Sequence, residues 1–298
     1  MNRVLRGSIA VLLALALAGE AGRGQSVATL RARLEARIAA SGAEVGLYFL
    51  DLDRGDSILL GAHIRFHAAS TMKVPVLMQV FRDADAGRLV LDDSIAVTRT
   101  FASFVDGSPY ALDRADDSDS TLYAREGGKA SVRELAELMT TVSSNLATNL
   151  LIEQVGAARA HATAHALGAD SIRVLRGVED GKAYRAGLSN TTTARDLGVL
   201  FTALARGTVA SPGSCREMLA ILERQRFNEG IPARLPPGAR VAHKTGSITA
   251  LYHDAGIVTT PAGRRWVLVV LTRGLEDEKA AHELVGDLSR MVYEGVVR

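Results

Sequence analysis

The C-terminal third of the chain constrains the fold most, because three strand-like runs follow one another there with only short turns between them. The runs are Arg240–Thr245, Ala255–Thr259 and Trp266–Thr272, and a helix is predicted after them from about Glu276 to Tyr293. Parallel neighbours would need long crossover connections, whereas short turns suit antiparallel hairpins. The sequence therefore predicts an antiparallel sheet in this third of the chain.

A second hairpin is predicted near the N-terminus. The runs Glu44–Asp51 and Ser57–Leu60 are strand-like, and polar residues at positions 53–56 provide a turn between them. A helix over about Val27–Ala40 precedes the hairpin, because apolar residues recur along it at helical spacing. Further helices are predicted to begin at the capping box that starts with Ser131, at Asn145, after the capping run Thr191-Thr192-Thr193, and at Ser211 with Pro212 in the first turn.

The first 25 residues have the pattern of a secretory signal. Arg3 and Arg6 precede an apolar run over Ile9–Gly19, and small residues follow it. The run is shorter than the roughly 20 residues that span a bilayer, so we expect no membrane span and an exported protein, either secreted or periplasmic. Without this segment the chain has 32 basic and 32 acidic residues, which indicates no nucleic-acid partner.

Residues 26–298 contain no internal repeat, low-complexity tract or long linker, so we expect a single catalytic unit. Cys215 is the one cysteine of the sequence, which excludes an intramolecular disulfide. A mature chain of about 270 residues buries enough surface to fold without one. Stability is therefore expected to come from the core.

The segment Ser70-Thr71-Met72-Lys73 places a hydroxyl and an amine three residues apart at a predicted helix start. Residues with this spacing share a helix face, so Lys73 can activate Ser70 as a nucleophile. The helix N-terminus also favours negative charge that develops beside the serine. A Ser-x-x-Lys pattern arises by chance about 0.3 times in a chain of this composition. Lysine, however, supplies only 5 of the 35 basic residues, and unlike arginine it can act as a base.

Three polar clusters lie in the middle of the chain. Ser143-Ser144-Asn145 separates two apolar helical runs, and Asn145 can cap the second helix while its amide faces a cleft. The acidic residues at positions 113, 116, 117 and 119 could hold a cation, but we interpret them as part of a solvated loop over residues 98–128. His161 and His165 lie one helical turn apart, yet the zinc-protease pattern is absent, so we interpret them as structural and predict no metal site.

Lys244-Thr245-Gly246, on the strand that begins at Arg240, is the next informative segment. Lys-Thr-Gly is expected by chance about 0.03 times in a chain of this composition, so its presence together with Ser-x-x-Lys disfavours coincidence. With these segments the chain resembles the superfamily of serine β-lactamases and penicillin-binding proteins, whose signatures are Ser-x-x-Lys, Ser-Asp-Asn and Lys-Thr-Gly. The runs Val142–Leu151 and Asn190–Ala194 make it most similar to the class A β-lactamases.

The resemblance implies a fold and a function. The fold class is α/β (α+β), β-lactamase/transpeptidase-like, with an antiparallel five-stranded sheet flanked by helices and an all-helical lobe. The site would lie between these two interleaved lobes. The function implied is that of an exported serine hydrolase that opens β-lactam rings by acylation and hydrolytic deacylation. The partner would be a small β-lactam, no metal or organic cofactor would be needed, and the protein would be a monomer.

The resemblance also assigns roles to residues. Ser70 would attack the strained amide, and Lys73 would act as base or proton relay. Ser143 would pass a proton to the departing ring nitrogen. The backbone N–H groups of Ser70 and Ser247 would bind the oxyanion. The substrate-binding residues implied are Asn145, for the acyl side-chain amide, Lys244 and Thr245, for the carboxylate, and Ser247.

The loop that carries the deacylating glutamate departs from the class A pattern. Glu179 is the nearest match to that glutamate. In the family an Asn follows the glutamate four residues later, whereas this chain has Ala183 at that position. Arg176 precedes Glu179 by three residues instead of two, and Asn190 replaces an Asp that pins the loop by a salt bridge. Asp180 is a second candidate for the same role. The motif Ser-Ser-Asn in place of Ser-Asp-Asn keeps the two outer, reacting side chains.

Other functions compete with the leading one. A D,D-peptidase or esterase of the same fold would use the same acylation chemistry on peptidoglycan peptides or on esters. Glutaminases have a related serine–lysine pair, but they would not explain a signal peptide. A cell-wall binding module with a vestigial site would be expected to have lost at least one of the reacting side chains, and all of them are present.

Overall fold

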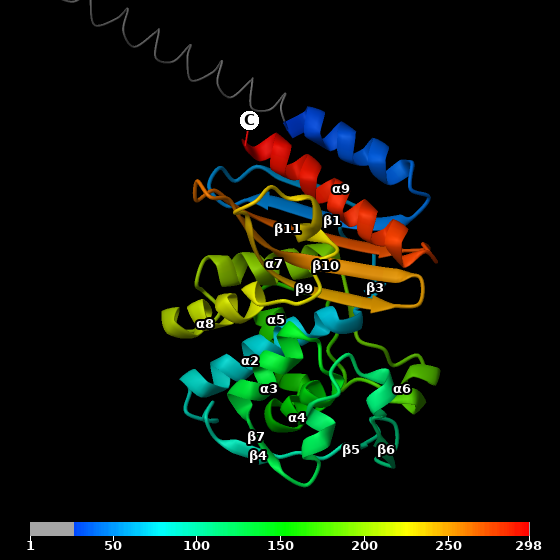
Figure 1. The fold of residues 1–298 in the computed structure, drawn as a ribbon, viewed down its shortest axis with the longest axis vertical. Helices are drawn as coiled ribbons and strands as arrows, with labels where there is room; N and C mark the ends of the chain where they lie inside the picture. The colour runs from blue at the N-terminus through cyan, green and yellow to red at the C-terminus, as the bar shows by residue number, and fades with distance from the viewer. Residues whose placement is uncertain (1–26, 298) are drawn as a thin grey trace, which may run out of the picture.

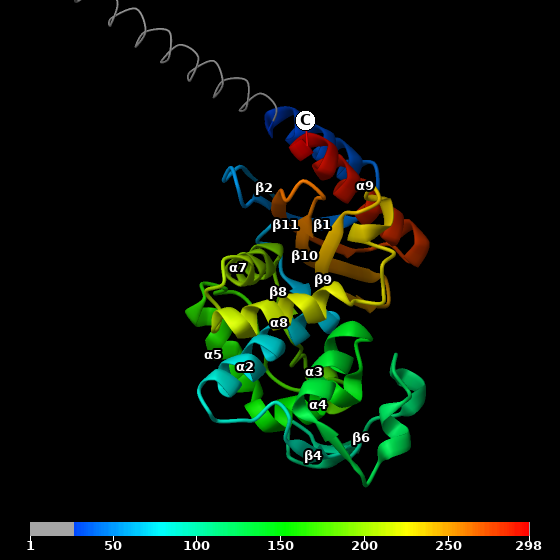
Figure 2. The same ribbon diagram turned by 60° about the vertical axis from the view of Figure 1, so that its left-hand side comes forward.

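Both ends of the chain build one lobe of the protein, and its middle builds the other. The computed structural model describes residues 27–297, so the predicted signal segment lies outside the described residues. In Figures 1 and 2 the sheet lobe lies at the top, with the first and last helices on its outer face, and the helical lobe lies below it. Among the helices of residues 27–297, none combines the length and the apolar character needed to cross a bilayer.

The central sheet has five antiparallel strands in the order β2-β1-β11-β10-β9. Their bounds are β1 (Glu44–Asp51), β2 (Ser57–Leu60), β9 (Arg240–Ile248), β10 (Leu251–Thr259) and β11 (Arg265–Arg273). The predicted antiparallel five-stranded sheet is confirmed. β10 begins four residues before the predicted Ala255, because the polar side chains of Tyr252, His253 and Asp254 are buried within the strand and conceal its apolar pattern.

Short strands and turns complete the chain. Three small ribbons pair β3 (Phe66–His67) with β8 (Thr191–Thr192), β4 (Ser94–Ala96) with β7 (Lys129–Ser131), and β5 (Thr100–Ala102) with β6 (Pro109–Ala111). The 3₁₀ turns are η1 (Ala69–Met72), η2 (Arg114–Asp116), η3 (Leu122–Arg125) and η4 (Ile231–Arg234).

The helices follow the predicted capping signals. A helix over residues 27–39 opens the described chain. The others are α2 (Lys73–Asp85), α3 (Val132–Thr141), α4 (Asn145–Val155), α5 (Ala157–Ala166), α6 (Gly181–Arg185), α7 (Ala194–Ala205), α8 (Pro212–Glu223) and α9 (Glu278–Val297). The side chains of Ser131, Thr193 and Ser211 each accept a hydrogen bond from a backbone N–H of the first turn, so these three predicted caps are confirmed.

The sheet is buried on both faces, which explains its continuous apolar runs. Side chains of a strand alternate between the two faces, so β11 contributes to two cores. Trp266, Leu268 and Val270 pack with residues of the first helix and α9. Val267, Val269 and Leu271 belong to the larger core that the sheet shares with the helical lobe.

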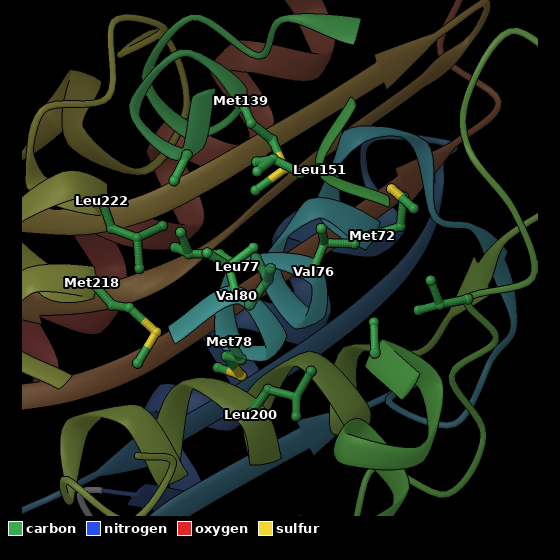
Figure 3. Close-up of a cluster of buried hydrophobic side chains, with 14 of the residues drawn as sticks. Met72, Val76, Leu77, Met78, Val80, Met139, Leu151, Leu200, Met218 and Leu222 are labelled. Atoms are coloured by element: carbon green, nitrogen blue, oxygen red, sulfur yellow. The ribbon is translucent and has the colours of Figure 1, made fainter. Parts of the chain in front are cut away.

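Helix α2 lies at the centre of the larger core. Every residue from Lys73 to Phe81 is buried, as expected for a helix surrounded on all sides. Figure 3 shows Val76, Leu77 and Val80 of α2 among side chains from neighbouring helices. Burial of one such side chain contributes about 1.5–3 kcal/mol. Dense packing around α2 therefore fixes the position of Ser70 and Lys73 at its start.

The polar segment over residues 98–128 is more ordered than the predicted solvated loop. It contains β5, β6, η2 and η3. Asp113 and Asp116 are exposed, as predicted, but Asp119 is buried and Asp117 accepts hydrogen bonds from the start of α4. The prediction is therefore wrong for Asp117 and Asp119, because the segment folds back onto the helical lobe.

Candidate active site

A cleft of about 390 Å³ runs between the two lobes. Four of the predicted site residues line it, and these are Ser70, Asn145, Glu179 and Ser247. Lys73, Ser143 and Lys244 are buried beside it and are joined to it by hydrogen bonds. Thr245 lies between Lys244 and Ser247 on β9. The fold thus brings all eight predicted residues to one place from four separate segments of the chain.

Ser70 lies in η1, directly before α2, as the helix-start prediction requires. The preceding residue, Ala69, has φ of 44°, a left-handed conformation that is uncommon for a residue with a side chain. His67 holds this bend, because its Nδ1 accepts a hydrogen bond from Ala69 N at 3.0 Å. Sequence reasoning did not find His67, although a polar residue between Phe66 and Ala68 in a buried segment was a usable signal.

Gly246 allows β9 to approach Ser70 closely. A Cβ atom at this position would lie 2.9 Å from the backbone nitrogen of Ser70 and 3.0 Å from that of Thr71. Any larger residue would push β9 away from η1. The glycine of Lys-Thr-Gly is therefore required by contact between the two lobes at the nucleophile.

Lys73 is almost completely buried and contacts three oxygen atoms. Its Nζ donates to the carbonyl oxygen of Ser143 at 2.6 Å, to Ser143 Oγ at 3.1 Å and to Asn145 Oδ1 at 2.9 Å. Within the described residues these bonds do not include Ser70 Oγ, because the carbonyl, hydroxyl and amide oxygens occupy the three donors of Nζ. Burial lowers the pKa of Lys73 to about 7, although the charges of Asp117 and Glu179 oppose the shift. A lysine with this pKa exchanges protons readily at neutral pH.

The hydroxyl of Ser143 lies between two lysines. Its Oγ accepts from Lys73 Nζ at 3.1 Å and from Lys244 Nζ at 3.0 Å. A hydroxyl oxygen has two lone pairs, so its own hydrogen remains available for a third group. Ser143 has φ of 58°, again left-handed. This conformation directs the side chain towards both lysines from the turn between α3 and α4.

Lys244 approaches Ser143 from the opposite lobe. It is buried on β9, and its Nζ also donates to the carbonyl oxygen of Thr245 at 2.9 Å. Burial and the nearby charge of Lys73 lower its pKa well below the ordinary value of a lysine, and Asp254 acts against this shift. Asp254 lies behind the strand, where its Oδ1 is 2.8 Å from Nδ1 of the buried His243.

Asn145 is hydrogen-bonded to both Lys73 and Glu179. Its Oδ1 accepts from Lys73, and its Nδ2 donates to Glu179 Oε1 at 3.1 Å. The predicted capping role of Asn145 is wrong, because Ser144 caps α4 by accepting from Ala147 N at 3.2 Å. With the cap supplied by its neighbour, both ends of the Asn145 amide are free for the site.

Glu179 has φ of 59° and reaches into the cleft from the loop over residues 173–190. Burial and the charge of Asp116 raise its pKa above that of an ordinary glutamate, while Lys73 acts in the opposite sense. A carboxylate with a raised pKa is a stronger base when it is ionised. The backbone around it is held by Asn149, whose Oδ1 accepts from Val178 N at 2.7 Å.

Asp180, the alternative to Glu179, has a different surrounding. Its carboxylate accepts from Ala183 N at the start of α6, from Phe104 N and from Ser103 Oγ. Despite burial, these hydrogen bonds lower its pKa. Asp180 therefore caps α6 and ties the loop to the segment before β6, and it does not face Asn145.

Asn190 joins the two ends of the loop over residues 173–190. Its Oδ1 accepts from the backbone N–H groups of Leu175 and Arg176 at 2.8 and 3.3 Å, and its Nδ2 donates to Arg176 O at 3.0 Å. These bonds replace the salt bridge that the class A pattern suggested. Sequence reasoning missed Asn149 and the short helix α6. The signal for Asn149 was one amide within the apolar run of α4.

The fold and the site define a class of protein. A serine, two buried lysines and a loop glutamate between a helical lobe and an antiparallel five-stranded sheet match the predicted architecture of serine β-lactamases and penicillin-binding proteins. A family model described as the β-lactamase enzyme family matches residues 29–296. The chain belongs to the β-lactamase enzyme family.

Individual relatives agree with this assignment. A β-lactamase of Streptomyces albus G is 27% identical over 285 residues, which cover 93% of this chain and 88% of the relative. The crystal structure of a β-lactamase from Sphaerobacter thermophilus superposes with a TM-score of 0.77 at 30% identity and covers 92% of this chain and 97% of its own. A variant of PBP-A, solved as an acyl-enzyme complex with penicillin G, has a TM-score of 0.77 at 31% identity and covers 91% and 97%.

Proposed function

We propose that this protein is a class A-like serine β-lactamase, which acylates Ser70 with the β-lactam and then hydrolyses the ester. One observation carries the proposal. Hydrogen bonds run without a break from Lys244 through Ser143, Lys73 and Asn145 to Glu179. This chain of hydrogen bonds joins the two lysines and Ser143, proposed for proton transfer and substrate binding in acylation, to Glu179, proposed for deacylation, and it lies beside Ser70 in a single cleft.

In the acylation step, Ser70 Oγ attacks the carbonyl carbon of the four-membered amide. Its proton passes to Lys73, whose pKa of about 7 suits a base at neutral pH. The bond between the carbonyl carbon and the ring nitrogen then breaks, and the nitrogen takes the hydroxyl proton of Ser143. Ser143 recovers a proton from Lys73, to which it is hydrogen-bonded. The products are an ester on Ser70 and a neutral lysine.

In the deacylation step, a water molecule attacks the ester carbonyl. Glu179 takes a proton from this water as its oxygen bonds to the carbonyl carbon. The bond from that carbon to Ser70 Oγ then breaks, and the proton held by Glu179 passes to Ser70 Oγ, which restores the free enzyme. The hydrogen bond from Asn145 Nδ2 orients the Glu179 carboxylate. Positive φ at Glu179 requires a fixed loop, which Asn149 and Asn190 supply.

Substrate binding is assigned to β9 and its surroundings. β9 is an edge strand, so one row of its backbone groups is not used by the sheet and is available to the cleft. Lys244 would attract the substrate carboxylate, with Thr245 beside it, and Asn145 would contact the acyl side-chain amide. The N–H groups of Ser70 and Ser247 would hold the oxyanion, where donors of this kind are worth about 2.7–4 kcal/mol each.

The proposal extends to the context of the enzyme. Residues 1–25 have the charge and apolar pattern of a signal peptide, which supports export to the periplasm or the medium. Residues 26–298 would then act as one catalytic unit, as a monomer and without a metal or an organic cofactor. Near-equal numbers of acidic and basic residues in that unit support the absence of a nucleic-acid partner.

A second candidate is a penicillin-sensitive D,D-peptidase or esterase that acylates in the same way but deacylates slowly with β-lactams. Ala183 favours it, because this fully buried methyl group stands where the class A pattern places an Asn four residues after the deacylating glutamate. The PBP-A variant that forms an acyl-enzyme with penicillin G is consistent with either candidate.

Intact-protein mass, followed over time after mixing with a penicillin, tests the proposal. We expect a transient adduct of the mass of the penicillin, with release of hydrolysed product. A lasting adduct would establish the second candidate instead. Absence of any adduct, or an unchanged rate of adduct formation in Ser70→Ala, would refute both.

A further inference from the structure

The motif Ser143-Ser144-Asn145 lacks the central Asp of the family signature Ser-Asp-Asn. A carboxylate is nevertheless present at this turn, and it comes from a different part of the chain. Asp117, between η2 and η3, places both of its oxygens at the start of α4. Asp117 was one of four acidic residues that the sequence pattern assigned to a solvated loop.

Asp117 satisfies two backbone groups of the motif turn. Its Oδ1 accepts from Asn145 N and its Oδ2 from Leu146 N, each at 2.9 Å. The first N–H groups of a helix have no acceptor within the helix, and a negative charge there also interacts favourably with the helix dipole. Asp117 therefore fixes the backbone of the residue whose amide joins Lys73 to Glu179.

The same loop holds the motif on its other side. Ser118 Oγ donates to Val142 O at 2.7 Å, one residue before Ser143. Asp117 is itself held by Tyr123, whose hydroxyl donates to Oδ2 at 3.0 Å. Two adjacent loop residues thus clamp the turn from both ends. Such a clamp is needed, because the left-handed conformation of Ser143 costs about 1–3 kcal/mol and persists only where its surroundings impose it.

Asp117 also contributes charge to the site. Burial is the largest influence on the pKa of Lys73 and lowers it, while Asp117 and Glu179 raise it. Lys244 faces the same region from β9 and is itself affected by the charge of Lys73. The charge of Asp117 also contributes to the raised pKa of Glu179, together with burial and Asp116. Loss of the Asp117 charge is therefore expected to lower the pKa of either candidate base.

We propose that Asp117 is a positioning residue that replaces the missing carboxylate of the motif: it fixes Ser143 and Asn145 against Lys73 from a neighbouring loop. The inference rests on the proposed acylation of Ser70, although not on whether the ester is later hydrolysed. It assigns a function to an acidic residue that has no counterpart in the three sequence signatures.

The experiment compares Asp117→Asn with wild type and with Asp113→Asn, an exposed acid of the same loop that caps η2 and does not contact α4. Acylation is read from the rate of adduct formation with a penicillin, as a function of pH. We expect Asp117→Asn to slow acylation about 10- to 100-fold, because the negative charge is removed and one of two part-buried N–H groups loses its acceptor. Its acid limb should move to lower pH, since a base with a lower pKa stays deprotonated in more acidic solution, whether that base is Lys73 or Glu179. Asp113→Asn should leave the acylation rate and its acid limb unchanged.

A second substitution tests the replacement itself. Ser144→Asp returns a carboxylate to the motif, and Asp is as good an N-cap as Ser. In the Asp117→Asn background it should recover at least tenfold of the lost acylation rate and move the acid limb back towards that of the wild type. If Asp117→Asn does not fold, recovery of folding and acylation in the double variant supports the proposal, and its absence overturns it.

Two results would overturn the inference while leaving the proposed function intact. One is an Asp117→Asn variant that acylates at the wild-type rate. The other is a slower variant whose acid limb is unmoved and which Ser144→Asp does not improve. If the wild type itself forms no adduct, it is the proposed function that fails.

Discussion

The two walls of the cleft are held in place by different kinds of interaction. On one side, β9 lies in a regular ladder, in which Lys244 is opposite Ala255 and Gly246 is opposite His253 of β10. On the other side, the loop over residues 173–190 depends on single side chains. Asn149 bonds to the backbone of Val178, Asn190 to that of Leu175 and Arg176, and Asp180 to that of Ala183.

This difference separates the two halves of the reaction. The sheet wall carries Lys244, Thr245 and Ser247, which are proposed to bind the substrate and the oxyanion during acylation, and the position of β9 is shared among many backbone bonds. The loop wall carries Glu179, the group proposed for deacylation, and its position depends on a few replaceable contacts. Deacylation should therefore be the step that single substitutions alter most easily. The predictions that follow test this contrast, in decreasing order of expected effect.

Glu179→Gln should show the largest effect, and it should slow deacylation without slowing acylation. A general base contributes about 10² to 10⁴ in rate, so release of the ester should slow by that factor. Acylation should remain within a few-fold of wild type, because Lys73 and Ser143 are unchanged. Single-turnover mass measurements separate the two rates. Release of the penicillin adduct at the wild-type rate would remove Glu179 from the mechanism.

Gly246→Ala tests the sheet wall. A Cβ atom there would lie 2.9 Å from Ser70 N, and overpacking of this kind costs about 1–3 kcal/mol. We expect acylation to slow about 10- to 100-fold. Gly213→Ala in α8, where the nearest atom to a new Cβ is 3.9 Å away, is the matched control and should be neutral. Unchanged acylation in Gly246→Ala would mean that β9 can move away from the nucleophile.

Asn190→Ala should loosen the loop wall without touching Glu179. Two backbone N–H groups lose their acceptor, which costs about 1–3 kcal/mol in the free energy of unfolding. Denaturant unfolding measures this loss, and release of the adduct should slow more than its formation. Asn190→Asp keeps the acceptor oxygens, so its free energy of unfolding should fall less than that of Asn190→Ala. A variant that slowed both steps equally would contradict the separation of the two walls.

Lys244→Arg should have the smallest effect at neutral pH, with kcat/KM within about tenfold of wild type, because a guanidinium also binds a carboxylate. The informative difference is at high pH. The lowered pKa of Lys244 means that its charge is present below that pKa and disappears as the pH rises through it, so KM of the wild type should increase. Arginine stays charged, and KM of the variant should remain flat. Parallel KM profiles would mean that Lys244 does not bind the carboxylate.

The sequence predicted those parts of the protein that local patterns determine. Strand-like runs joined by short turns located the sheet, and Ser-x-x-Lys and Lys-Thr-Gly located Ser70, Lys73 and Lys244 at or within regular elements. Asp117 could not be found in this way, because its partners at the start of α4 lie about 28 residues away in the chain. A loop acid that is solvated and one that caps a distant helix have the same local sequence.

The sequence decided wrongly, or left a choice open, where two residues compete for one role. Ser144 and Asn145 are both good capping residues, and only the turn geometry decides that Ser144 accepts from Ala147 N. Asp180 and Glu179 are adjacent carboxylates, and the structure directs one to α6 and the other to Asn145. Such choices depend on backbone angles that propensities do not encode.

The left-handed residues of the site have a consequence for heat tolerance and for evolution. Ala69, Ser143 and Glu179 each hold a conformation that costs about 1–3 kcal/mol, and together these costs are comparable to the total stability of about 5–15 kcal/mol of a typical domain. Glycine at any of the three would relax the backbone and raise the melting temperature, but it would also release a reacting or neighbouring group from its place. Lineages of this enzyme that adapt to hot surroundings should therefore gain their tolerance in the two cores and leave these three positions alone.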